Sequence, residues 1–201
     1  GLMWRGKAFQ DHKYWLELAS LSGHEGSMRL KGHGIDLGWI SRLDYPLEPS
    51  VTIGYALGSG DPDLADGVDK NFQQTGLQDN QGKFNGVTKF KYYGELFDPE
   101  LSNIMIGTTG IGISPFQKSS LDVVYHYYSQ VYRANLLRDV GIKKEPSGRS
   151  RDLGHEVDLI FGIKIIRNIQ MEIFTAIFIP GKAFSDTDRA FSQEVKAQIT
   201  F

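Results

Sequence analysis

The chain of 201 residues carries 24 acidic and 22 basic side chains, which gives a formal net charge of -2, and it contains no cysteine. A balance this close to neutral does not indicate a nucleic-acid binder, because such proteins normally carry a basic excess. The absence of cysteine excludes disulfide scaffolds and thiolate metal sites. No apolar run approaches the roughly 20 residues of a membrane-spanning helix, which excludes a helical membrane protein.

Apolar and polar residues alternate with a period of two along most of the chain. In "HEVDLIFG", for example, Val157 and Leu159 alternate with Glu156 and Asp158. A helix would mix these two sets on every face, whereas a strand sends them to opposite sides. We therefore predict an all-β, antiparallel protein with strands at residues 12–21, 31–43, 50–60, 101–114, 120–132, 155–165, 169–179 and 190–201.

Two stretches depart from simple alternation. In "NIMIGTTGIGIS", Ile104 and Ile106 are out of phase with Ile111 and Ile113, and we attribute the change of phase to a β-bulge at an intervening glycine. In "FDPELS", Asp98 followed by a proline predicts the start of a single helical turn, with the aspartate as its N-cap.

The predicted connections alternate between short and long. The short ones are 44–49, 115–119 and 166–168, and the longer ones are 22–30, 61–100, 133–154 and 180–189. Short periplasmic turns that alternate with long extracellular loops are typical of up-and-down transmembrane β-barrels of the bacterial outer membrane. We treat residues 1–201 as one barrel domain with long extracellular loops at about 61–100 and 133–154. The segment 87–97 is interpreted as an ordered part of the first loop, either a hairpin or a segment folded into the lumen.

The composition of the two predicted faces favours a membrane protein. One set of alternating positions is rich in Gly, Ala, Gln and charge, which would make a poor dry core, and the other is aliphatic and aromatic. Aromatic residues gather toward strand ends, at Tyr45, Tyr55, Phe191 and Phe201, as in an interfacial girdle. A soluble β-sandwich or lipocalin-like barrel, with its apolar face turned inward, remains the alternative.

Four segments also resemble a known family. They are "FQQTGLQDN" (72–80), "YYGELFDPELSNI" (92–104), "DVVYHYY" (122–128) and "GHEVDLIFG" (154–162). Together they are similar to the C-terminal part of the alginate export family of outer-membrane β-barrels. The resemblance implies an anion-selective pore that passes a polyuronate exopolysaccharide across the outer membrane.

The resemblance also implies a barrel larger than this chain can form. A closed barrel of about eight strands would be filled by its own side chains and could not pass a polymer. We therefore expect the chain to be the C-terminal part of a barrel of about 16–18 strands, or a shortened relative. The implied partners are the lipid bilayer, an anionic polysaccharide, the barrel-assembly machinery through the terminal aromatic Phe201, and periplasmic secretion partners. A general solute porin and a soluble carbohydrate-binding β-protein remain the alternative functions.

The passage of a polyanion requires fixed positive charge where the pore narrows, because a wide aqueous lumen screens charge within roughly 8–10 Å. On the predicted lumen face the basic residues are Lys13, Arg42, Lys164 and Lys196, and the acidic ones are Glu17, Asp36, Asp122, Glu156, Asp158, Glu172 and Glu194. As pore-lining candidates we single out Arg42, Lys89, Lys91, Lys164, Lys196, Asp122, Asp158 and Glu172. The acidic surplus leaves a solute other than alginate open. Cross-strand pairing that stiffens the wall is the alternative role for each residue.

Enzyme chemistry has little support in the sequence. The five histidines show no metal-ligand spacing. Ser119, Ser120, Asp122 and His126 lie close together, but the two serines fall in a predicted turn without an oxyanion-hole signature. We expect neither a catalytic site nor a metal or cofactor.

Overall fold

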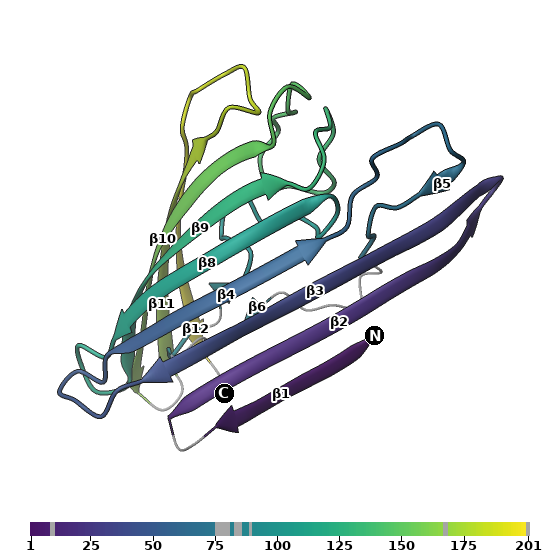
Figure 1. Ribbon diagram of the computed structural model, residues 1–201. Coiled ribbons are helices and arrows are strands. Elements are labelled where there is room, and N and C mark those ends of the chain that lie inside the picture. Colours follow the sequence, from purple (N-terminus) through teal and green to yellow (C-terminus); the bar gives the residue numbers. More distant parts are fainter. Residues whose placement is uncertain (9–10, 75–80, 83–85, 89, 167–168, 200–201) are drawn as a thin grey trace.

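The computed structural model describes residues 1–8, 11–74, 81–82, 86–88, 90–166 and 169–199. Its strands form a sheet in the order β1-β2-β3-β4-β8-β9-β10-β11-β12 (Figure 1). Every neighbouring pair along this path is antiparallel. The bounds are β1 (Leu2–Ala8), β2 (His12–Glu25), β3 (Met28–Arg42), β4 (Ser50–Gly58), β8 (Ile104–Ile113), β9 (Ser119–Gln130), β10 (Asp152–Ile166), β11 (Ile169–Pro180) and β12 (Ala190–Ile199).

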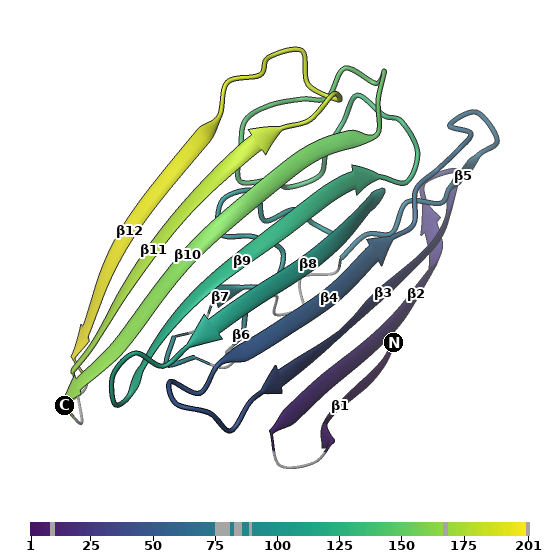
Figure 2. The same ribbon diagram turned by 60° about the vertical axis from the view of Figure 1, so that its left-hand side comes forward.

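The sheet is open, because β1 and β12 form its two edges and do not pair with each other in the part of the chain that the structure describes. Figure 2 shows it curving around the segment that links β4 to β8, so that it has a concave and a convex face. That segment holds β5 (Val68–Asp69), which pairs in parallel with β3, and the two-stranded pair of β6 (Gln81–Gly82) and β7 (Phe90–Lys91). Among the described residues, no helix is long and apolar enough to cross a membrane.

All eight predicted segments are strands, but the N-terminal region differs from the prediction in two ways. β1 was not predicted, because its apolar Met3 shares a face with Arg5 and Lys7 and blurs the alternation. The predicted loop 22–30 is a turn of two residues, since Glu25 already pairs with Met28. Beyond residue 20 the apolar residues Leu21, Met28 and Leu30 fall on the concave face and the convex face becomes polar, so the alternation changes phase although the strands continue.

The predicted β-bulge and the predicted helical turn are both wrong. β8 keeps an unbroken register with β4 and β9 along its length. Ile104 and Ile106 are fully buried on the concave face, whereas Ile111 on the convex face is 65% exposed. Ile104 and Ile106 are out of phase with Ile111 because they belong to an apolar cluster that covers one end of the concave face. Asp98 has a φ of 35°, outside the extended region that an N-cap requires, and it forms an ion pair with Lys91 instead.

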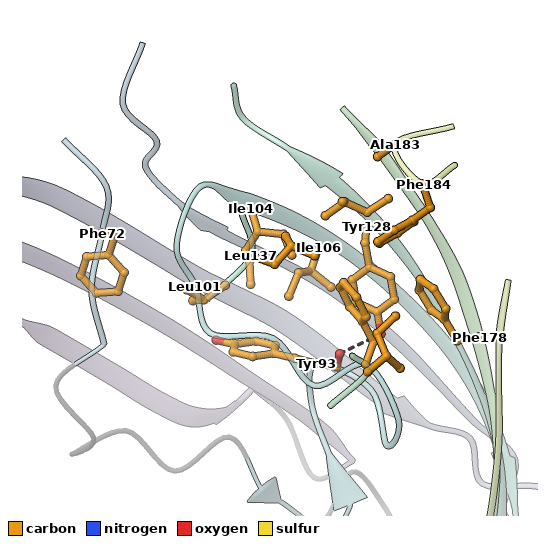
Figure 3. Packing of buried hydrophobic residues seen from close by; sticks show 14 residues of the cluster. Phe72, Tyr93, Leu101, Ile104, Ile106, Tyr128, Leu137, Phe178, Ala183 and Phe184 are labelled. Atoms are coloured by element: carbon orange, nitrogen blue, oxygen red, sulfur yellow. Dashed lines mark hydrogen bonds between the residues drawn. The ribbon is translucent and has the colours of Figure 1, made fainter. Parts of the chain in front are cut away.

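The apolar cluster, which we call the inner cluster, fills the concave face at the end where the long connections lie (Figure 3). Phe97 is at its centre, stacked on Phe178 at a centroid distance of 4.8 Å and tilted against Tyr128 at 4.6 Å. The members are Ala56, Phe72, Tyr93, Phe97, Leu101, Ile104, Ile106, Tyr128, Leu137, Ile142, Leu153, Phe178, Ala183 and Phe184. Three separate connections therefore pack onto the strands and onto one another through this cluster.

Truncation of Phe97 to alanine tests whether the inner cluster stabilises the fold. We expect Phe97→Ala to lower the free energy of unfolding by about 3–5 kcal/mol, because a buried aromatic ring is replaced by a cavity. Phe116→Ala is the matched control, since Phe116 is 64% exposed in the β8–β9 turn, and it should change the value by less than about 0.5 kcal/mol. Equal effects in denaturant titrations of the two variants in detergent would contradict this role for the cluster.

Candidate functional site

One segment of the connection between β4 and β8 crosses the concave face and is held there by side chains of the sheet. We call residues 86–88 and 90–98 the inner strap. The chain bends sharply at Gly94, which has a φ of 107°, a value that side-chain-bearing residues rarely adopt. A Cβ atom at this position would also collide with the Tyr128 hydroxyl and the Glu156 carboxylate. Glycine thus allows the strap to approach β9 and β10 closely.

Glu156 on β10 binds the strap through its backbone. Its Oε1 accepts a hydrogen bond from the N–H of Leu96 and its Oε2 accepts one from the N–H of Phe97, both at 2.8 Å. Nearby, the Tyr128 hydroxyl donates to the carbonyl oxygen of Tyr93 at 2.8 Å. Glu156 is fully buried. A buried carboxylate needs such donors, so Glu156 and the strap satisfy each other's polar groups.

A second buried carboxylate lies two residues further along the same strand. Asp158 Oδ2 accepts a hydrogen bond from the N–H of Glu95 at 3.2 Å and lies 3.4 Å from Nε2 of His126. The other ring nitrogen of His126 is 2.9 Å from the Thr108 hydroxyl oxygen. Successive inward positions of β10 thus bind three consecutive N–H groups of the strap, those of Glu95, Leu96 and Phe97.

Asp36 on β3 ties the strap to the other half of the sheet. It accepts hydrogen bonds from the indole N–H of Trp15 at 2.6 Å and from the hydroxyl of Tyr93 at 2.7 Å. The Trp15 ring in turn stacks on Tyr92 of the strap, at a centroid distance of 5.5 Å. The strap is therefore fastened on both sides, to β2 and β3 as well as to β9 and β10.

The structure places the predicted acidic residues on the concave face but covers two of the three. Asp158 is fully buried beneath the strap, and Asp122 is 5% exposed beside Gly86 and Ser120. Ser120 accepts a hydrogen bond from the N–H of Val87 at 2.9 Å, so the strap is bound here too. Glu172 on β11 is half-buried.

The predicted cations lie at separate places on the concave face. Lys91 in the strap pairs with Asp98 at 2.8 Å; burial opposes its charge, but the contact with Asp98 prevails and raises the pKa of the ammonium group. Lys196 lies 2.9 Å from Glu194 and 4.8 Å above the Phe174 ring. Arg42 pairs with Glu48 at 3.2 Å, and Lys164 is exposed near the end of β10. Lys89 lies outside the described residues.

One group of charges depends on the unpredicted strand. Lys7 on β1 is directly opposite Lys13 on β2, and Arg42 lies close enough to add its charge to theirs. We call Lys7, Lys13 and Arg42 the basic group. Like charges directly across a strand pair are destabilising, so such a group is unfavourable unless an anion is bound there. The alternation placed Lys13 and Arg42 on this face, but without β1 nothing indicated that Lys7 joins them.

Among the described residues, the same face shows no arrangement suited to metal chemistry. Within the described ranges, no group of three or more His, Asp or Glu side chains is arranged to hold a metal ion. Its buried carboxylates are engaged with backbone N–H groups, hydroxyls and an indole. The arrangement can hold a loop rigidly across a curved wall and present charge toward the enclosed space.

Comparison with known proteins defines the class. The family model described as alginate export matches residues 1–198, and the chain belongs to this family. It is 30% identical over 145 residues to the "Alginate production protein AlgE" of Azotobacter vinelandii, and 33% identical over 128 residues to the protein of that name from Pseudomonas aeruginosa. These matches cover 68% and 63% of this chain, but the chain spans only 29% and 25% of the length of the relatives.

Removal of the Glu156 carboxylate tests whether it holds the strap. In Glu156→Ala the N–H groups of Leu96 and Phe97 lose their acceptors, and we expect their amide hydrogens to exchange on the order of 100-fold faster. The measurement is hydrogen exchange with peptide-level resolution over residues 90–98. Glu194→Ala, which removes an exposed carboxylate from β12, is the control and should leave the strap protected. Unchanged protection in Glu156→Ala would show that other contacts hold the strap.

Proposed function

We propose that this chain forms part of the wall of a β-barrel in the bacterial outer membrane, through which an alginate-like anionic polysaccharide is exported by passive passage. The observation that carries the proposal is the alginate export family match over residues 1–198. A transport role for that family also fits a concave face whose buried polar groups are engaged structurally.

The convex face supports a wall that contacts lipid. Its exposed side chains along the central strands are aliphatic, among them Leu37, Ile53, Ile111, Val123, Val157, Leu159 and Ile177. The apolar positions of β10 run from Val157 to Ile165, which is within the roughly 9–11 residues that a tilted strand needs to cross the hydrocarbon of a membrane. Near the short-turn end, Trp39 packs against His12 and Tyr14 at centroid distances of 5.4 and 6.3 Å, as an interfacial aromatic group would.

The open sheet requires additional strands in this proposal. An unpaired strand edge cannot remain in lipid, so β1 and β12 need partners that close the barrel. A barrel of about 16–18 strands would supply them and leave room for a polymer. The expected contact of Phe201 with the assembly machinery and the expected periplasmic partners stay predictions, and Phe201 lies outside the described residues.

The inner strap changes the charge that a solute would meet. Asp36, Asp122, Glu156 and Asp158 are all at most 8% exposed, so four of the seven acidic side chains assigned to the lumen face by sequence are withdrawn from its surface. Of the remaining three, Glu17 pairs with Arg5 and Glu194 pairs with Lys196. The acidic surplus of the sequence therefore does not oppose an anionic solute. Lys91 and Lys196 are offset in the same way, by Asp98 and Glu194. We propose the basic group, together with the exposed Lys164, as the charges that it meets.

A charge on the convex face tests the contact with lipid. We expect Ile53→Arg to destabilise the inserted protein by about 2–4 kcal/mol, because the guanidinium would lie in hydrocarbon. The measurement is the folded fraction in membranes, read from heat-modifiable gel migration. Gln198→Arg is the control, since Gln198 is exposed on the concave side of β12. Equal folded fractions, or a water-soluble monomer, would favour the soluble carbohydrate-binding alternative.

Planar-bilayer recording of the complete barrel tests export. We expect an anion-selective current that polyuronate blocks, and a block about tenfold weaker in a Lys7→Ala/Lys13→Ala variant, because two fixed charges are lost from the wall. Lys182→Ala, in the exposed β11–β12 connection, is the control and should be blocked normally. A cation-selective current, or a current that the polymer does not change, would contradict the export proposal and favour a general solute porin.

A further inference from the structure

A cavity of about 550 Å³ opens at the long-loop end of β2 and β3, and we call it the rim cavity. β3 extends beyond the end of β4, which stops at Gly58 opposite Gly34. The chain after β4 turns away there and returns as β5 beside β3. The side chains of the rim cavity that matter below are Ser20, Ser22, Lys31, His33, Lys70 and Tyr132.

The polar side chains of β2 and β3 in the rim cavity lie on the convex face. Phe72 packs against the α-carbon positions of Gly32 and Gly34 from the concave side. Because successive side chains of a strand point to opposite faces, Lys31 and His33 point away from Phe72. Their direct cross-strand partners, Ser22 and Ser20, share that direction. The rim cavity is thus separate from the strap and from the basic group.

The charge of the rim cavity is positive. None of the described residues that line it is acidic. Lys31 and His33 are exposed, and among the described residues neither has an ion-pair partner, whereas Lys70 pairs with Asp66. The carboxylates of Asp61 and Asp63 accept backbone N–H groups of their own loop and also act electrostatically on Lys70. Lys31 therefore carries the positive charge of the lining that no described carboxylate offsets. The lining combines the hydrogen-bond donors named above with the apolar side chains of Leu21, Leu57, Pro62 and Val131.

The rim cavity begins where the apolar part of the convex face ends. Along paired positions of β2 and β3 the sequence runs from Leu16–Leu37 to Leu18–Ile35, then to Ser20–His33 and Ser22–Lys31. The change from aliphatic to basic and hydroxyl side chains occurs within one step of the register. In a membrane wall this step marks the level at which hydrocarbon gives way to charged headgroups.

We propose that the rim cavity binds the phosphate of an anionic lipid headgroup in the leaflet on the long-loop side. The inference rests on the proposed membrane function. Phosphate oxygens accept hydrogen bonds and carry negative charge, which complements two ammonium groups, an imidazole and several hydroxyls. Leu57 lines the cavity, and Leu18 and Ile35 are one step along the register from Ser20 and His33 on the same face. The acyl chains of the same lipid would lie against these three side chains. A soluble anion would gain nothing from this apolar border.

Binding of defined probes tests the proposal. The complete protein in neutral detergent is titrated with diphosphorylated lipid A, dephosphorylated lipid A, inorganic phosphate and an alginate oligomer, and binding is followed by native mass spectrometry. We expect binding of the diphosphorylated lipid, weakened about tenfold or more in Lys31→Ala/Lys70→Ala and retained in Lys31→Arg. Lys143→Ala, an exposed cation of the β9–β10 connection, is the control and should bind normally.

Three results would overturn the proposal: equal binding of both forms of lipid A, undiminished binding by the double variant, or displacement of the lipid by equimolar inorganic phosphate or alginate oligomer. Heat-modifiable migration checks that each variant is folded. Conductance of the same preparations separates this inference from export. If polyuronate blocks the current normally but the lipid does not bind, the lipid site in the rim cavity is contradicted and export is not. If the lipid binds in a lysine-dependent way but polyuronate does not block the current, the rim site is supported and export is contradicted.

Discussion

The structure depends on the capture of backbone N–H groups by carboxylates buried in the sheet. A loop that crosses the inside of a curved sheet carries amide groups away from bulk water, and each unpaired one would cost on the order of 1–3 kcal/mol. Glu156 and Asp158 supply acceptors at adjacent inward positions of β10, and the strap supplies three consecutive donors. A buried carboxylate without hydrogen-bond donors is as unfavourable as a buried N–H group without an acceptor. Neither the acidic side chains nor the strap could therefore be buried there without the other. The strap and its strand therefore form together.

This mutual dependence organises the rest of the concave face. Once the backbone of Leu96 and Phe97 is fixed, the Phe97 ring lies between Phe178 and Tyr128 and the inner cluster closes around it. On the other side, Asp36 fixes Tyr93 and orients Trp15 under Tyr92. The long-loop end of the face is thereby occupied by protein. The basic group lies at the short-turn end of the sheet, on the part of the concave face that the strap does not cover.

The sequence predicted the eight principal strands and the direction of most side chains, because period-two alternation survives wherever one face of the sheet is apolar. It failed where that contrast is lost. Met3 interrupts the polar face of β1, and in the outer part of the β2–β3 hairpin the apolar residues move to the concave face while the convex face becomes polar. The change of phase at Ile104 and Ile106 was interpreted as a bulge, but it arises because these residues belong to the inner cluster, which makes part of the concave face apolar. The role of the buried acids could not be predicted, since alternation assigns a face but not what covers it. The position of Lys7 next to Lys13 could not be predicted either, because it depends on the pairing of β1, a strand that the sequence did not predict.

The pairing of Lys7 with Lys13 has a thermodynamic consequence for the proposed channel. Two like charges held opposite each other raise the free energy of the empty wall, and a bound anion relieves that repulsion. By linkage, any ligand that binds only the folded wall also stabilises it. The transported polymer would then act as a folding ligand, and the wall would be most stable while it is occupied. Salt would partly substitute for the polymer, because mobile ions screen the same repulsion within about 8 Å at physiological ionic strength.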